Sequence, residues 1–274
     1  MMERALTSEL QAVVEDISDV SRHVWESGWS AANGGNLTVD VTGLVPDSMV
    51  RVAGLRELPL PLPTTSLAGR ALFTTVSGAR FRDVERYPER SLALIYVLAD
   101  GDACQVLWGG EGEGRPTSEL AAHLRIHEHL RAQHSDRRVV LHTHPTHLIA
   151  MTHLPEFRTP DFVRVLEVSL STAYVFLHEG IGMVGPEQMG SNTLADETVR
   201  LLEGRRVVLW ERHGCIAVGQ DVFEAFDLTD MLEKASEIFL ACVSAGYEPK
   251  RMTAREIADL RGSEGGRPSS QLTD

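Results

Sequence analysis

Two histidines separated by one residue, His142 and His144, follow a short apolar run at 139–141. Such a run is typical of a buried strand, and residues two apart in a strand point to the same side. Both imidazoles could therefore leave the strand end on one face and bind one metal ion. Zinc that keeps a coordination position open usually takes three protein ligands. A third candidate is His213, which follows a second strand-like run at 207–210.

Each of these histidines has a simpler alternative, a hydrogen-bonded side chain at a strand end, because short motifs are weak evidence. His147 and His153 lie close downstream, and we expect them on the next helix or its exit loop, as outer or surface groups. A structural zinc site would need four ligands, usually rich in cysteine. The three cysteines include no CxxC pair, so the sequence does not favour that class of site.

Glu119 follows two hydroxyl-bearing residues, Thr117 and Ser118, where a helix is predicted to begin with Ser118 as its N-cap. An acid in the first helical turn is usually a surface charge that complements the helix dipole. A carboxylate close to a metal-bound carbonyl can instead move the proton on the adjacent carbon. Glu119 is therefore a candidate for general acid–base chemistry.

Three short segments could supply groups that bind an anion. Asn33 and Asn36 enclose two glycines, which could free backbone N–H groups to form a nest for phosphate. Ser77 follows a predicted strand, and Thr117 and Ser118 stand at the predicted helix start, where the dipole is positive. The alternatives are an ordinary Gly/Asn turn and simple helix capping.

The composition limits the classes of partner. The chain has 274 residues, 43% of them hydrophobic, which suits one large α/β domain or two small ones. The formal net charge is −13, and the sequence contains no cluster of Lys or Arg residues. We therefore expect no nucleic-acid partner, and an anionic substrate would depend on local donors and a metal.

The sequence also bears on the compartment. The cysteine count is odd, which favours a reducing environment. The first ten residues carry charges rather than an apolar signal segment, and no run is long and apolar enough for a membrane span. We expect a cytoplasmic protein without membrane association.

Hydrophobic periodicity predicts alternating helices and strands. A long amphipathic helix is expected over 6–25, and residues 43–70 are expected to be irregular. Further helices are predicted from Ser118 and over 146–152, 193–203, 222–245 and 253–261. Strands are predicted at 37–41, 71–77, 92–98, 103–108, 139–141, 173–177, 206–210 and 215–218.

These elements predict a single domain over residues 1–261, followed by a disordered tail at 262–274 that is rich in Gly, Ser and Pro. No internal repeat or linker divides the chain. The expected fold class is α/β: a three-layer α/β/α sandwich around a central, largely antiparallel or mixed sheet.

Six segments carry a family resemblance over nearly the whole chain. They are NGGNLT (33–38), SGARFRDV (77–84), PTSELAAH (116–123), HTHPTHLIAMT (142–152), VLWERHG (208–214) and FDLTDMLEKA (226–235). In this order they resemble the zinc-dependent class II aldolases of sugar phosphates, in the group that acts on fuculose and rhamnulose phosphates. The combination is far more specific than any single motif.

The resemblance implies a role for each matching residue. It implies that His142, His144 and His213 bind one zinc ion (Zn2+) per chain and that Glu119 is the catalytic acid/base. It also implies a phosphate-binding set made of Asn33, Asn36, Ser77, Thr117 and Ser118. The implied reaction is cleavage of a ketose 1-phosphate, with L-rhamnulose 1-phosphate expected, to dihydroxyacetone phosphate and L-lactaldehyde. The implied assembly is a homotetramer with active sites at subunit interfaces.

The chain departs from the family pattern at two places. The family's second acid, contributed by a neighbouring subunit, corresponds in a gapless placement to Thr172. The nearest replacement is Glu167, five positions earlier, with His178 and Glu179 as further candidates. Val76 stands where the resemblance predicts a glycine before Ser77.

The same scaffold allows other functions. A fuculose-phosphate aldolase, a pentulose-phosphate epimerase, a dehydratase or a decarboxylase would share the three histidines and differ in the acids and the phosphate loop. A non-catalytic interaction module, as in the adducin head domain, is the alternative of another class. Retention of the three histidines together with Glu119 argues against it.

Overall fold

One nine-stranded sheet organises the protein, as seen in a computed structural model that describes residues 5–112, 114–154, 157, 171–177, 179–250 and 252–264. The strand order is β2-β5-β4-β3-β1-β6-β9-β8-β7, and every neighbouring pair is antiparallel except β7 and β8. The strands are β1 (Asn36–Asp40), β2 (Glu57–Pro59), β3 (Ala71–Thr75), β4 (Leu92–Val97), β5 (Ala103–Gly109), β6 (Val139–Thr143), β7 (Ile181–Val184), β8 (Val207–Trp210) and β9 (Gly214–Gly219).

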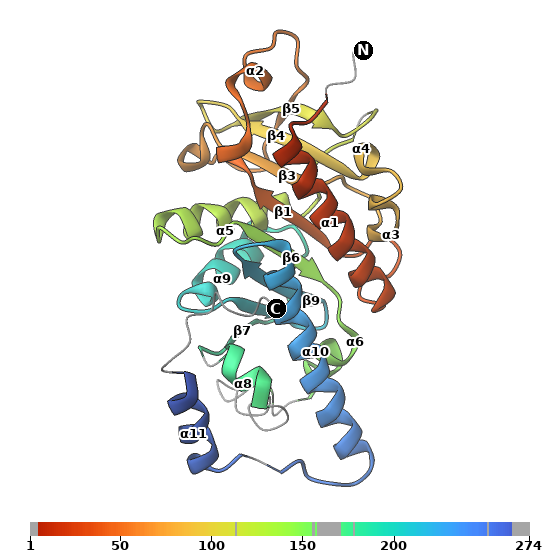
Figure 1. The fold of residues 1–274 in the computed structure, drawn as a ribbon, viewed down its shortest axis with the longest axis vertical. Coiled ribbons are helices and arrows are strands. Elements are labelled where there is room, and N and C mark those ends of the chain that lie inside the picture. Colours follow the sequence, from red (N-terminus) through yellow and green to blue (C-terminus); the bar gives the residue numbers. More distant parts are fainter. Residues whose placement is uncertain are drawn as a thin grey trace.

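Helices cover both faces of the sheet, which confirms the three-layer α/β/α prediction (Figure 1). On one face α1 (Ser8–Glu26) and α10 (Val222–Ser244) bury their apolar sides against the strands. On the other face α5 (Leu120–Ala132) and α9 (Asn192–Leu202) pack against each other and the sheet. The short helical segments are η1 (Thr42–Leu44), α2 (Asp47–Val50), η2 (Thr65–Leu67), α3 (Phe81–Val84), α4 (Pro88–Ser91), α6 (Thr146–Met151), α8 (Ser171–Leu177) and α11 (Ala254–Glu264).

The two longest helices, α1 and α10, begin where the sequence supplies caps. The Thr7 hydroxyl accepts a hydrogen bond from the backbone N–H of Leu10 at the start of α1. The Asp221 carboxylate does the same for Glu224 at the start of α10. Each cap satisfies a backbone donor that the helix itself leaves without a partner.

One edge of the sheet gathers the residues of interest. The first residue of β1, Asn36, pairs with His142 near the end of β6, and His142 pairs with Ile216 near the start of β9. The tight turn between β8 and β9 carries His213. Because neighbouring strands run in opposite directions, two strand starts, one strand end and one turn meet at this edge.

The structure corrects three sequence predictions. Residues 173–177 were predicted as a strand but lie in helix α8, and strand β7 follows at Ile181–Val184. A short apolar run has no periodicity that separates a buried strand from a buried helix. Ser118 is not the N-cap of α5: the helix begins at Leu120 and the cap position belongs to Glu119, whose side chain makes no capping hydrogen bond.

The third correction concerns the segment 43–70, which was predicted to be irregular. It holds η1, α2, η2 and the edge strand β2, which pairs with β5. Near the other end of the chain, α11 extends to Glu264, beyond the predicted limit of 261, and residues 265–274 lie outside the described part.

Two further predictions concern cysteines and membranes. Cys104, Cys215 and Cys242 are free thiols, and the first two are buried. In the described residues no helix combines the length and apolar character that crossing a bilayer requires.

Candidate active site

Three histidines converge at the sheet edge, as predicted. One ring nitrogen from each of His142, His144 and His213 lies within 4.8 Å of the others. The Nε2 atoms of His142 and His144 are 3.0 Å apart. His142 is fully buried, whereas His144 and His213 are partly exposed, so the cluster is open on one side. This arrangement has the nitrogen ligands and the accessibility of a metal site that admits a substrate.

The ring of His142 is fixed from two sides. Its Nδ1 lies 3.0 Å from the carbonyl oxygen of Cys215, which can only accept, so Nδ1 carries the proton. The lone pair of Nε2 therefore points into the cluster, which is the tautomer a metal ligand needs. Trp210 packs against His142 with ring centroids 4.6 Å apart and donates from Nε1 to Thr198. No sequence pattern indicated this contact of Trp210.

Burial keeps these imidazoles neutral. It lowers the pKa of His142 and of His144 to about 3 each, with neighbouring histidines as a second cause. Burial also lowers the pKa of His213, and this is opposed by the charge of Glu119. Neutral imidazole is the form that binds a metal, so the uncharged cluster fits a cation.

Two glycines let the backbone approach the histidines. A Cβ on Gly34 would lie 2.6 Å from Nδ1 of His144, and a Cβ on Gly214 would lie 2.7 Å from Cε1 of His142. Any side chain at either position would displace an imidazole. Gly34 of the 33–36 loop thus has a packing reason in addition to the backbone freedom inferred from the sequence.

Glu119 stands beside the three histidines, as predicted. Its Oε2 is 3.4 Å from Nε2 of His142, and its Oε1 is 3.6 Å from Nε2 of His213. The residue is only 6% exposed, although it carries a carboxylate. Within the described residues, Oε2 accepts a hydrogen bond from Asn36 and Oε1 accepts none. Oε1 is thus the oxygen available to a reacting proton.

Asn36 is committed to internal partners. Its Nδ2 donates to Oε2 of Glu119 at 2.7 Å, and its Oδ1 is 2.5 Å from Nε2 of His123. The side chain is buried. Asn36 therefore orients Glu119, a contact that the sequence analysis did not anticipate when it grouped Asn36 with the phosphate-binding set.

The other predicted phosphate-binding residues lie along the same edge. Asn33 is exposed in the loop that packs on His144. Ser77 and Ser118 are also exposed, and Thr117 is buried. The backbone bridge between Val76 and Pro116 holds the Ser77 turn beside Thr117 and Ser118. Their role in binding phosphate stays a prediction.

The remaining histidines have structural or surface positions. The backbone N–H and Nδ1 of His147 both contact the Glu233 carboxylate, which also caps the backbone of Leu148 at the start of α6. His153 is exposed. Neither joins the cluster of three, in agreement with the sequence prediction.

Only some of the candidates for the second acid lie within the described residues. Glu167 and His178 lie outside the described residues, and Thr172 lies within helix α8. Glu179 makes an ion pair with Arg206, 2.5 Å from Oε1 to Nε. That contact gives Glu179 a structural role next to the start of β7.

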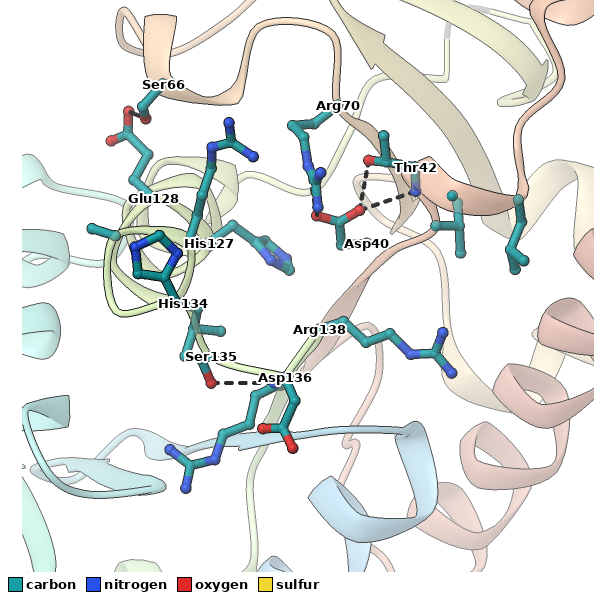
Figure 2. Close-up of a pocket in the computed structure, with 17 residues that line it drawn as sticks. Asp40, Thr42, Ser66, Arg70, His127, Glu128, His134, Ser135, Asp136 and Arg138 are labelled. Atoms are coloured by element: carbon teal, nitrogen blue, oxygen red, sulfur yellow. Dashed lines mark hydrogen bonds and ion pairs between the residues drawn. The ribbon is translucent and has the colours of Figure 1, made fainter.

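Two cavities in the described part of the protein do not coincide with the histidine cluster. A cavity of about 780 Å³ lies at the opposite end of β6, lined by Asp40, Arg70, His127, Arg138 and neighbouring residues (Figure 2). It contains none of the three clustered histidines. A second cavity, of about 430 Å³, is lined by Ser77, Arg80 and Arg90. We locate the active site from the histidines and Glu119, because chemistry requires those side chains together.

Known proteins are similar to this chain in both sequence and fold. The family model "Class II Aldolase and Adducin N-terminal domain" matches residues 15–240. Rhamnulose-1-phosphate aldolase from Bacteroides thetaiotaomicron is 32% identical over 249 residues, which cover 90% of this chain and 92% of that protein. The enzyme of the same name from Escherichia fergusonii is 33% identical over 250 residues, with 90% and 91% covered.

A solved structure gives the same result. The sugar-phosphate aldolase from Thermotoga maritima superposes with a TM-score of 0.77 at 30% identity, covering 88% of this chain and 99% of that one. L-fuculose 1-phosphate aldolase, at 17% identity and a TM-score of 0.62, shares the fold. With the histidine cluster and Glu119 in place, the chain belongs to the class II aldolase and adducin N-terminal domain family, as an enzyme of the lyase class.

Proposed function

We propose that this enzyme cleaves L-rhamnulose 1-phosphate to dihydroxyacetone phosphate and L-lactaldehyde in a metal-assisted retro-aldol reaction. The carrying observation is the buried Glu119 carboxylate held beside three neutral imidazoles that share one open side. The names of relatives that align along nine-tenths of the chain support the choice of substrate.

We propose zinc as the metal, one ion per chain. His142, His144 and His213 would hold it, because their neutral nitrogens form the type of donor set that zinc takes in open sites. The proton on Nδ1 of His142 leaves Nε2 free for coordination. When bound, the cation would supply Lewis-acid polarisation of the substrate carbonyl.

We propose that Glu119 transfers one proton to and from carbon C3 of the substrate. In cleavage a second base takes the proton of the C4 hydroxyl, the O–H electrons form the aldehyde carbonyl, and the C3–C4 electron pair stays on the C3 fragment as an enediolate. Glu119, which starts this direction in its protonated form, then delivers that proton to C3 and completes dihydroxyacetone phosphate as the carboxylate is formed. In the condensation direction the same carboxylate removes that proton. Asn36 keeps Oε2 engaged, so Oε1 performs the transfer.

The phosphate is proposed to bind at the exposed hydroxyls and amide of Asn33, Ser77 and Ser118, with Thr117 behind them. The side chain of Asn36 is bound to Glu119, so we propose that Asn36 contributes to phosphate binding only by holding the end of the 33–36 loop in place. These neutral donors suit a dianion in a protein whose net charge of −13 would otherwise repel it.

We propose Glu167 of a neighbouring subunit as the base for the C4 hydroxyl, and hence a homotetramer with active sites at its interfaces. Met189 is an exposed apolar side chain next to Gly190, where an added Cβ would lie 3.1 Å from the Ser118 carbonyl oxygen, so apolar surface lies close to the proposed phosphate-binding residues. Glu167→Gln should slow cleavage more than deuterium exchange at C3 of dihydroxyacetone phosphate, since exchange does not involve the C4 hydroxyl. Equal loss in both reactions would reject Glu167, and a monomer in light scattering would reject the interface.

The decisive experiment is a substrate panel. Zinc-loaded protein is incubated with the 1-phosphates of L-rhamnulose, L-fuculose and other ketoses, and release of dihydroxyacetone phosphate is followed. We expect L-rhamnulose 1-phosphate to give the highest kcat/KM. Release from L-fuculose 1-phosphate alone would change the substrate, and no cleavage of any ketose 1-phosphate would favour an epimerase, dehydratase or decarboxylase.

A further inference from the structure

A continuous chain of buried side chains connects Glu119 to the far side of helix α5. Asn36 donates to Oε2 of Glu119 at 2.7 Å, and its Oδ1 is 2.5 Å from Nε2 of His123. Nδ1 of His123 is 2.8 Å from the Thr38 hydroxyl, which is also 2.8 Å from Nε2 of His127. All five residues are less than 9% exposed. Four direct hydrogen bonds thus join five polar groups.

Two periodic rows build this chain. Asn36 and Thr38 are two residues apart on strand β1 and face the same side of the sheet. His123 and His127 are four residues apart on helix α5 and share its inner face, one and two turns beyond Glu119. The helix crosses the strand so that the two rows interdigitate.

The chemistry of the groups gives the chain one direction. A carboxylate can only accept, so Asn36 must turn its NH2 group to Glu119 and its carbonyl oxygen to His123. His123 therefore carries its proton on Nε2. Burial holds the pKa of His123 well below its usual range and that of His127 to about 4, so each ring has one proton.

The remaining protons follow by elimination. The bare Nδ1 of His123 accepts from the Thr38 hydroxyl, which uses its only proton. The Thr38 oxygen then accepts from Nε2–H of His127. Every donor in the chain points toward Glu119. A flip of the Asn36 amide would set oxygen against the carboxylate and NH2 against an N–H, so each link opposes that flip.

We propose that Thr38, His123 and His127 are positioning residues that lock the Asn36 amide and thereby hold Glu119 with Oε1 turned toward the reacting carbon. The proposal rests on the proposed function of Glu119. A fully satisfied buried network selects one arrangement of its members. An error of about 1 Å in the position of a catalytic group can cost about 10²-fold in rate. The outer end, His127, borders the cavity of Figure 2, away from the substrate, so it acts only through the chain.

A matched pair of substitutions at Thr38 tests the chain. Thr38→Val keeps the shape and removes the hydroxyl, whereas Thr38→Ser keeps the hydroxyl. With zinc-loaded protein, Thr38→Val should lower kcat for cleavage and the rate of C3 deuterium exchange about 10- to 100-fold. KM and metal content should stay unchanged, because Thr38 touches neither phosphate nor metal ligands. Thr38→Ser should stay within about threefold of wild type, because its hydroxyl can make the same bonds.

Two results would overturn the proposal. The first is a rate of C3 deuterium exchange in Thr38→Val that equals the wild-type rate. The second is a loss of rate in Thr38→Ser as large as that in Thr38→Val, because such a loss would come from altered packing and not from the missing hydroxyl. If Thr38→Val does not fold, His123→Leu and His123→Gln replace the pair: glutamine keeps an N–H for Asn36 and should retain more activity than leucine. Similar rates in these two variants would also reject the chain.

A spectroscopic measurement tests the chain apart from activity. In histidine-labelled, zinc-loaded protein, 15N spectra should show protonated Nε2 and bare Nδ1 in both His123 and His127, assigned with single His→Gln variants. A proton on Nδ1 of His123 would mean that the chain runs the other way, and the proposal would be wrong. If the wild-type protein catalysed neither cleavage nor exchange, the proposed function would be wrong. The 15N spectra of the two rings would still show whether the hydrogen bonds from His127 to Glu119 run in the proposed direction.

Discussion

Replacing Glu119 by glutamine should separate its chemistry from its place in the fold. The Glu119→Gln side chain has the same shape and keeps a carbonyl oxygen that can accept from Nδ2 of Asn36. Its NH2 group would then occupy the place of Oε1, 3.6 Å from Nε2 of His213. The hydrogen-bond chain through Asn36 is preserved, and the group that takes and returns a proton is lost.

The size of both effects follows from the groups that each variant keeps or loses. General acid–base groups contribute about 10²–10⁴-fold, so the barrier should rise by about 3–5 kcal/mol. The free energy of unfolding should change by less than about 0.5 kcal/mol, because no buried donor loses its partner. Glu119→Ala is the contrast: the buried NH2 group of Asn36 would have no acceptor, at a cost of about 1–3 kcal/mol.

Three measurements on wild type and both variants test this reasoning. Deuterium exchange at C3 of dihydroxyacetone phosphate follows the proton transfer, thermal unfolding follows stability, and elemental analysis follows the metal. We expect exchange to be lost in both variants, and the melting temperature to fall by several degrees only in Glu119→Ala. Near-normal exchange in Glu119→Gln, at unchanged metal content, would reduce Glu119 to a charge near a helix start. Equal melting temperatures would refute the assigned role of the Asn36 contact.

Three further predictions address the metal, the phosphate and pH. His142→Ala and His213→Ala should each lose most bound metal in elemental analysis, while the exposed His153→Ala should retain it; full occupancy in both cluster variants would reject the assigned ligands. Asn33→Ala should weaken binding of dihydroxyacetone phosphate about tenfold, the value of one hydrogen bond to a charged group, and leave unphosphorylated ketose unaffected; calorimetry checks this, and equal losses would contradict a phosphate role. Burial favours a raised pKa for Asp40, but hydrogen bonds from Thr42 and Arg70 outweigh it and the pKa is lowered, so the ionised form stabilises the fold. Asp40→Asn should therefore lose about 1.5–3 kcal/mol in urea unfolding at neutral pH, with the difference shrinking as pH falls below about 4; a difference independent of pH would contradict the ion pair.

The sequence predicted most elements that carry strong periodicity. Helix α10 and strand β6 lie close to their predicted limits, because a long apolar stripe or a bounded apolar run fixes the element by itself. Helix α8 was predicted wrongly because its seven residues are too few to show a period. Strand β2 was missed because an edge strand of three residues is held by its neighbour β5 rather than by its own sequence.

Some features of the site could likewise be predicted from the sequence, and others depended on the tertiary structure. Spacing alone placed His142 and His144 on one face, and it contained an unused signal: Glu119, His123 and His127 recur every four residues, and Asn36, Thr38 and Asp40 every two. Periodicity fixes which face of its own element a side chain occupies. It does not fix which other element that face meets. Strand order and register decided that His213 joins the other histidines, that Trp210 packs against them, and that Asn36 binds Glu119. These contacts exist only once the strands have paired and α5 has crossed β1, because they depend on the packing of elements far apart in the chain.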